Sequence, residues 1–310
     1  MATVIYTLLK ISSEGYDDYQ HVRIAQNNRI RDLIRRKAEG IPLDYPEDKK
    51  ENKTFDLKYK TENLPNILDE LVKDKKLSKM ELKYIKELQG IAEIAEKTEN
   101  YYKSLMLKVL KQEELWKDWL LKVKGIGPIL GAGLIKNFGY CETYVHISSL
   151  WRHCGYDPEG ALPKQVGKKT HYNPKLKTFV WKISESLLKQ RSQPYREVYD
   201  NEKERQVKLM EKCQCICCGK GPKEHSRNKK KYRDMEYHCK DGEIYSPDVP
   251  LAPMSLKHAD NRAKRKAVKI FLQHYWLVAR KMKGLEVSKP YPFDKLGEKH
   301  KHYISPPHLD

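Results

Sequence analysis

The chain has 310 residues, with 61 Lys and Arg against 42 Asp and Glu, a formal net charge of +19 and a sequence pI of about 9.4. It contains no run of 18 apolar residues and no basic, apolar leader, which argues against a membrane or secreted protein and favours a cytoplasmic one. The positive surplus favours an anionic partner, with nucleic acid the first candidate. The alternative is a Lys- and Glu-rich surface of the kind found in heat-adapted proteins.

The first segment, residues 1–62, is predicted to contain a basic helix over residues 19–38. Val22, Ile30 and Ile34 belong to a loose apolar stripe at helical spacing, and Gly40 and Pro42 end the pattern. Most of the Arg and Lys side chains lie off that stripe, so we expect some of them to contact phosphates. The candidates are Arg29, Arg35 and Arg36.

Residues 63–118 are predicted to form a coiled coil. Ser78 and Glu81 match the S-x-x-E capping box of a helix start. An apolar heptad follows and predicts one helix of about 40 residues. Its positions are Tyr84, Leu88, Ile91, Ala95, Thr98, Tyr102, Leu105 and Val109. The seam could pack on residues 63–73 or on a second subunit, and we expect a homodimer through the coiled coil. An ordinary bundle helix in one compact domain is the alternative.

Residues 119–200 begin with a predicted helix-hairpin-helix over residues 120–135. Its turn reads Gly-Ile-Gly-Pro, in which Gly125 and Gly127 permit a tight bend and Pro128 suits the first turn of a helix. Backbone amides at such a turn can bind a phosphate oxygen. Lys124, Gly125 and Gly127 are therefore candidate nucleic-acid ligands, and packing of the turn without nucleic-acid contact is the alternative.

A basic stretch follows the sequence LWRHCG at residues 150–155. Residues 163–178 contain five Lys and no acidic residue, with two interleaved aromatic rings that could stack on a base or ribose. A solvated basic loop is the alternative. The candidate contacts in this region are Arg152, Lys168, Lys169, His171 and Lys175.

These features together resemble the C-terminal domain of the RNA-guided insertion-sequence transposases, whose N-terminal domain is RuvC-like. The shared features are the GIGP turn, Gly139, the LWRHCG segment with the Asp-Pro after it, the Lys-rich turn, the YREVY sequence at residues 195–199 and a preceding coiled coil. The plan is also similar to the Nop domain of box C/D ribonucleoproteins and to the Tas proteins of tandem interspaced guide RNA systems. The resemblance covers roughly residues 80–200. It implies a Nop-like helical domain that binds a structured guide RNA and finds target DNA by base pairing.

Two departures from those transposases argue against intrinsic nuclease activity. Only about 75 residues precede the long helix of the coiled coil, too few for a RuvC-like domain, and they lack a pattern that would place carboxylates around two metals. The family's catalytic Ser would fall in residues 159–174, which contain no Ser. We therefore expect binding and assign no catalytic residue. The alternatives are a divergent transposase or nuclease that acts with RNA, and a guide-free architectural DNA-binding protein.

Residues 201–255 read as a Cys- and Lys-rich insertion containing five of the seven Cys. Cys215 and Cys218 have C-x-x-C spacing, and Cys239 with His225 or His238 could complete a tetrahedral structural Zn²⁺ site. The assigned ligands are Cys215, Cys218, His225 and Cys239. A competing pair of Cys213 and Cys217, free thiols, and an HNH nuclease knuckle with a catalytic His are the alternatives.

Residues 256–310 are predicted to form a basic helix and an extended tail. Cations crowd the first two turns of the helix, where the helix dipole disfavours them, so we expect an anionic partner there. The candidate contacts are His258, Asn261, Arg262 and Arg265. Four basic blocks, at residues 23–37, 163–178, 220–231 and 257–269, account for the whole positive surplus. The overall prediction is a mainly α protein with a coiled coil, a helix-hairpin-helix domain and a Cys-rich insertion.

Overall fold

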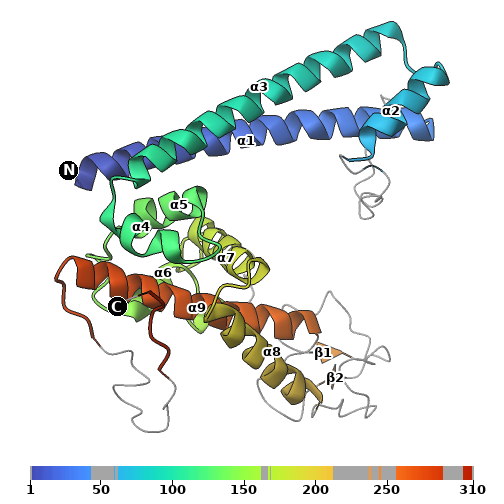
Figure 1. Cartoon of the computed structure of the whole chain (residues 1–310). Helices are drawn as coiled ribbons and strands as arrows, with labels where there is room; N and C mark the ends of the chain where they lie inside the picture. Colours follow the sequence, from blue (N-terminus) through green and yellow to red (C-terminus); the bar gives the residue numbers. More distant parts are fainter. Residues whose placement is uncertain are drawn as a thin grey trace. The chain divides into compact units, whose positions relative to one another are not determined.

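The structure is a computed structural model that describes residues 2–42, 59, 62–161, 167, 169–211, 237–238, 244–245, 256–288 and 303–308. The predicted mainly α fold is confirmed (Figure 1). Two short strands, β1 (Tyr237–His238) and β2 (Ile244–Tyr245), pair antiparallel. Across these described ranges, every helix is too short or too polar to cross a membrane. The chain divides into two compact units, residues 1–109 and 110–310.

The first unit consists of α1 (Ala2–Glu39), α2 (Leu64–Lys73) and α3 (Lys79–Leu110). The two long helices lie side by side and antiparallel, with α2 packed on α1 (Figure 1). Ion pairs join them: Arg23 Nε lies 2.5 Å from Glu99 Oε1, and Lys37 Nζ lies 2.6 Å from Glu81 Oε1. Because α1 is 38 residues long, it extends well beyond the basic helix predicted over residues 19–38.

The predicted capping box at the start of α3 is confirmed. The Ser78 amide donates to Glu81 Oε2 at 2.8 Å, and the Glu81 amide donates to Ser78 Oγ at 3.2 Å. The helix is 32 residues long and ends at Leu110, shorter than the predicted 40. The chain turns there, and the following residues Leu115, Trp116 and Trp119 are buried in the second unit. Tertiary burial of these side chains thus overrides the local helical pattern.

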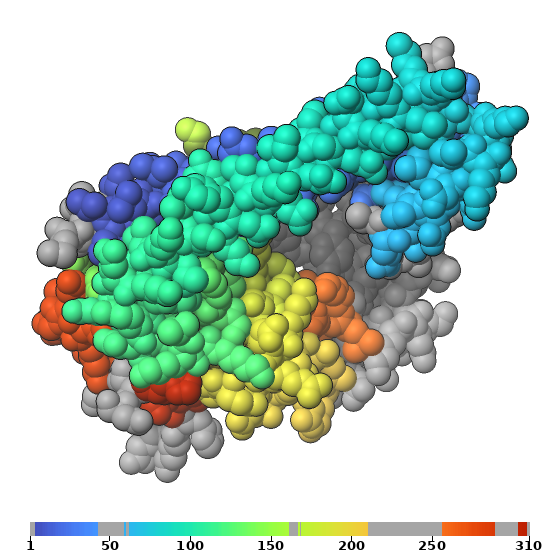
Figure 2. All heavy atoms as spheres, turned by 45° about the horizontal axis from the view of Figure 1, so that its top comes forward, coloured from blue at the N-terminus to red at the C-terminus, as the bar shows by residue number. Residues whose placement is uncertain are grey.

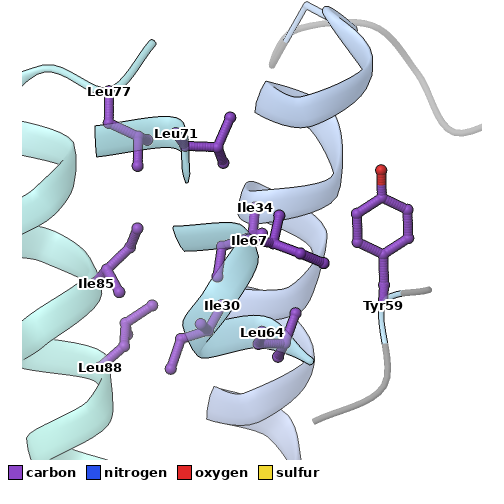
Figure 3. Close-up of a cluster of buried hydrophobic side chains, with 9 residues drawn as sticks. All are labelled: Ile30, Ile34, Tyr59, Leu64, Ile67, Leu71, Leu77, Ile85 and Leu88. Carbon is purple, nitrogen blue, oxygen red and sulfur yellow. The ribbon is translucent and has the colours of Figure 1, made fainter. Parts of the chain in front are cut away.

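The seam of α3 packs on helices of its own chain. Leu88 and Ala95 of the predicted seam are buried, but Tyr84 and Ile91 are exposed. Their neighbours Ile85 and Ala92 are buried instead, so the packed face is rotated by about one residue from the prediction. Figure 3 shows the core at one end of this unit, where side chains of α1, α2 and α3 meet. The cluster contains Ile30, Ile34, Tyr59, Leu64, Ile67, Leu71, Leu77, Ile85 and Leu88.

The second unit is built around α9 (Leu256–Met282), whose residues 271–280 are all buried. The other helical elements of this unit are α4 (Glu114–Asp118), η2 (Leu120–Lys122), α5 (Pro128–Phe138), α6 (Ile147–His153), η3 (Glu159–Ala161), α7 (Pro174–Lys189) and α8 (Tyr195–Glu211). α8 makes the most extensive contact with α9, and α6 and α7 also pack on it (Figure 1). Aromatic rings fill the centre, with Phe271 between Trp119 and Tyr195 at centroid distances of 6.0 and 5.4 Å.

Residues 303–308 form a short segment of the tail that is fixed to this core. The Trp119 indole donates to the carbonyl of Pro307 at 2.8 Å, and His274 Nε2 lies 2.8 Å from the carbonyl of Ile304. Since a carbonyl only accepts, His274 carries its proton on Nε2, and Nδ1 accepts from the Tyr195 hydroxyl at 3.1 Å. Burial lowers the pKa of His274 to about 4, which keeps this imidazole neutral.

Candidate nucleic-acid interface

The GIGP turn packs tightly on α7. Gly125 has a φ of +97°, and a Cβ built there would lie 3.2 Å from the Ser186 carbonyl oxygen. Ser186 Oγ donates to the Gly125 carbonyl at 2.6 Å, and the amide of Ile126 donates to the carbonyl of Val123 at 3.0 Å. Much of the turn's backbone is therefore used in internal packing. Pro128 is the first residue of α5, as predicted, but the 3₁₀ turn η2 stands where a full first helix was expected.

A cleft of about 770 Å³ opens beside this turn, within the second unit. Three segments that are distant in sequence form its walls: residues 122–124 before the GIGP turn, residues 191–194 between α7 and α8, and the tail segment 303–308. Figure 2 shows the tail segment in dark red at the surface, beside the green hairpin region and the yellow α7–α8 region. The lining residues are Lys122, Lys124, Arg191, Ser192, Gln193, Pro194, Tyr303, Ile304, Ser305, Pro306, Pro307 and His308.

The cations of this cleft have no acidic partner in the described part of the chain. Lys122, Lys124 and Arg191 are exposed, and among the residues that the structure describes their side chains form no ion pair or hydrogen bond. Among the described residues, no acidic side chain lines the cleft. Tyr303 is 45% exposed and His308 is exposed on the tail side. A positive cleft with an accessible ring can accommodate a phosphate and a base.

Several lysines of α9, by contrast, have acidic partners within the unit. Lys266 Nζ lies 2.7 Å from Glu202 on α8, and Lys264 Nζ lies 2.6 Å from Glu185 on α7 and 3.1 Å from Asp260. Burial opposes ionisation of Glu202, but hydrogen bonds, including the one from Lys266, lower its pKa to about 2. Burial likewise opposes ionisation of Asp260, and hydrogen bonds, including the one from Lys264, lower its pKa to about 2. Carboxylates of the same unit thus offset part of the positive charge of α9, and an external anionic partner there stays a prediction.

Arg265 supports a loop. Its guanidinium donates to the carbonyls of Gly155 and Asp157, and it lies over the Tyr156 ring at 5.1 Å. Burial lowers the pKa of this side chain. The other predicted contacts on α9 also face inward: Arg262 lies 3.2 Å from His258 Nε2 and 3.1 Å from Gln206 Oε1, and Asn261 Oδ1 is buried.

The loop after α6 gathers His171 with two carboxylates. His171 Nε2 lies 3.1 Å from each carboxylate oxygen of Asp157, and Nδ1 lies 3.6 Å from Glu159. One ligand atom from each of these three side chains lies within 4.8 Å of the others, a spacing that a metal ion could bridge. Arg152 lies 3.9 Å from Glu159, while Lys169 and Lys175 are exposed without an ion pair in the described part of the chain.

The predicted contacts of the first unit bond mainly to their own helix. Arg29 donates to Gln26 at 2.9 Å, and Arg35 and Arg36 both bind Asp32 at 2.9 Å. Five other predicted site residues lie outside the described residues. They are Lys168 and the proposed zinc ligands Cys215, Cys218, His225 and Cys239.

The structure therefore brings Lys124 together with residues that the sequence analysis did not select. Arg191, Ser192, Tyr303 and His308 all line the cleft. None of them lies in a charge block or a recognisable motif, and more than 100 residues separate the tail from the α7–α8 turn. No family model matches the chain, and no curated protein or solved structure matches it.

Proposed function

We propose that the chain binds a structured RNA, uses it as a guide to engage DNA, and has no nuclease activity of its own. The observation that carries the RNA-binding part is the cleft beside the GIGP turn. Its cations Lys122, Lys124 and Arg191 have no acidic partner among the described residues, whereas Lys264 and Lys266 of α9 do. Exposed cations without internal partners are the ones available to displace counterions from a phosphate backbone.

The form of the cleft favours RNA with unstacked nucleotides. Aromatic side chains and cations bind single-stranded loops, bulges and ends, where bases are free to stack. Tyr303 supplies such a ring beside the cleft cations. The guide role and the DNA target rest on the resemblance of residues 80–200 to the RNA-guided proteins.

The nucleic acid that co-purifies with the protein after a high-salt wash tests this proposal. We expect one discrete RNA species, lost after ribonuclease treatment together with DNA binding. The variant Lys122→Gln/Lys124→Gln should recover much less of it. A heterogeneous or absent RNA, or tight binding of duplex DNA that survives ribonuclease, contradicts the proposal. Metal-dependent nicking of DNA by the purified complex contradicts the lack of nuclease activity.

The proposal includes a homodimer through the first unit, because α3 has a second apolar stripe. Tyr84 and Ile91 each precede a buried residue of the packed face by one position, which is about 100° around a helix. Ile94 and Tyr101 continue the same side with exposures of 64% and 62%. These side chains form a flank that the α1–α3 contact leaves uncovered.

A matching stripe runs along α1. Leu8 and Ile11 are exposed, and each precedes a buried residue by one position, as on α3. In an antiparallel pair of helices, residues one position before the packed residues lie on the same side of the pair on both helices. The two stripes therefore share one face. Such a face can pack against its own copy around a two-fold axis.

Molar mass measured by light scattering during size-exclusion chromatography tests the dimer. We expect a dimer for the native chain and a monomer for Ile91→Glu/Ile94→Glu. Ile24→Glu is the control, because Ile24 is also exposed but lies outside the stripe. It is about 200° around α1 from the exposed Val22, which follows Leu8 by two heptads. A monomeric native chain, or equal dissociation by the control, contradicts this assembly.

The proposal also includes a structural zinc ion in the Cys-rich insertion, because Cys215 and Cys218 have C-x-x-C spacing. Elemental analysis should find one zinc per chain, lost in Cys215→Ser/Cys218→Ser. Absence of zinc from protein purified without chelators contradicts this assignment.

A further inference from the structure

Arg191 occupies a backbone position that usually belongs to glycine. The end of α7 is a Schellman turn, in which the Ser192 amide donates to the Leu187 carbonyl at 2.9 Å and the Arg191 amide to the Leu188 carbonyl at 3.1 Å. Arg191 has a φ of +53° at the left-handed position of this turn. His308, at a φ of +59°, also lines the cleft, so two left-handed residues other than glycine border one cavity. Such backbone conformations concentrate at binding and catalytic sites.

The next residue, Ser192, has a buried hydroxyl without a partner. Ser192 is 1% exposed, and its Oγ forms no hydrogen bond with any described residue. An unsatisfied buried hydroxyl destabilises a fold, so its presence in the wall of a cationic cleft needs an explanation. A bound anion accepting this hydrogen bond supplies one. Arg191 and Ser192 are thus adjacent residues of the cleft that each carry a locally destabilising feature.

From this combination we infer that the cleft binds a single nucleotide, with its phosphate between Lys122, Lys124, Arg191 and the Ser192 hydroxyl and its base against Tyr303. In the described part of the chain, three cations and no acidic residue line the cleft, which suits the negative charge of a phosphate group. The volume of about 770 Å³ suits a small ligand with an apolar portion. The prolines Pro306 and Pro307 add apolar surface beside the ring.

The nucleotide could belong to an RNA strand or be free in solution, and both present the same nucleoside phosphate. Binding of a nucleotide that belongs to an RNA strand rests on the proposed function, whereas the nucleotide site itself does not. Calorimetric titration with adenosine monophosphate, adenosine and inorganic phosphate measures the site directly. Titration with a labelled single-stranded hexaribonucleotide measures the affinity for an RNA strand.

The variants Arg191→Gly and Ser192→Ala give the sharpest test, because they should act oppositely on stability and binding. Glycine relieves the left-handed strain and alanine removes the unsatisfied hydroxyl, so Tm should stay equal or rise. The Kd for adenosine monophosphate should rise about tenfold for Arg191→Gly and about threefold for Ser192→Ala.

Lys75→Gly is the matched control. Lys75 has a φ of +53° in the same kind of turn after α2, where the Lys76 amide donates to the Leu71 carbonyl at 3.0 Å. This change removes one positive charge and one strained residue from the first unit. As for Arg191→Gly, we expect Tm to stay equal or rise, but nucleotide affinity should not change.

The outcomes separate this inference from the proposed function. Phosphate binding as tightly as the nucleotide, or unchanged affinity in both cleft variants, overturns the nucleotide site even if the chain carries a discrete RNA. If the nucleotide binds as predicted but neither RNA nor the hexaribonucleotide does, the site stands with a free nucleotide as its ligand and the proposed function fails. Tighter binding of the hexaribonucleotide than of the mononucleotide, weakened by Arg191→Gly, supports both.

Discussion

The first turns of α9 and the cleft beside the GIGP turn are both rich in Lys and Arg, but their charges have different surroundings. On α9, Lys264 and Lys266 bind carboxylates of α7 and α8, and Arg265 binds backbone carbonyls. In the cleft, Lys124 and Arg191 find no acidic partner among the described residues. Two basic regions of the same chain thus differ in how far their charge is offset by acidic groups of that chain.

The largest effect that this comparison predicts is on stability, at Arg265. Arg265→Met should destabilise the second unit by about 2–4 kcal/mol, because it leaves the carbonyls of Gly155 and Asp157 without their donor. Urea denaturation followed by circular dichroism measures the change. Lys124→Gln, the cleft counterpart, should stay within about 0.5 kcal/mol of the native chain. Equal stability of the two variants would contradict a structural role for Arg265.

Acidification should have the next largest effect on stability. It acts through His274, which bonds to the tail segment that lines the cleft. The pKa of His274 is about 4 in the folded chain against an ordinary 6.5, so the unfolded chain binds a proton that the folded chain does not. Stability should therefore fall by roughly 2–3 kcal/mol as pH drops from 6.5 to 4. Denaturation midpoints across this range measure it, and His274→Gln should flatten the dependence. An equally steep fall in that variant would assign the effect to other groups.

The ion pair between α8 and α9 should give a smaller effect. Glu202→Gln should destabilise by about 1–2 kcal/mol, because Glu202 is 4% exposed and accepts bonds from Lys266 and Arg205. A double-mutant cycle with Lys266→Gln isolates the pair, and we expect a coupling of about 0.5–1 kcal/mol. A coupling near zero would show that Lys266 is as available to an external anion as the cleft cations are.

Local signals predicted the parts of the fold that depend on neighbouring residues. The mainly α class and the Ser78–Glu81 capping box follow from patterns a few residues long, and both are confirmed. The packed face of α3 was predicted one residue off, because Tyr84 and Ile85 both fit heptad spacing. Only the long-range partner α1 decides between them.

Long-range contacts explain why the candidate site was only partly predicted. The dipole argument predicted an anionic partner for the cations of α9, but Glu202 lies 64 residues before Lys266 in the chain and its proximity has no local signature. The cleft likewise joins Lys124, Arg191 and Tyr303 from distant segments. Lys124 was selected from the turn motif, whereas Arg191 and Tyr303 carry no signal that single-sequence reasoning could detect.

The most direct test compares the salt dependence of RNA affinity for two variants that each remove two positive charges. In the cleft, Lys122→Gln/Lys124→Gln should reduce the slope of log affinity against log salt by about 1.4–1.8, the value for two phosphate contacts. On α9, Lys257→Gln/Lys266→Gln removes side chains that are 72% and 53% exposed but paired with Asp260 and Glu202, and the slope should change by no more than about 0.3. Equal reductions, or a larger one for the α9 variant, would contradict the assignment of RNA binding to the cleft.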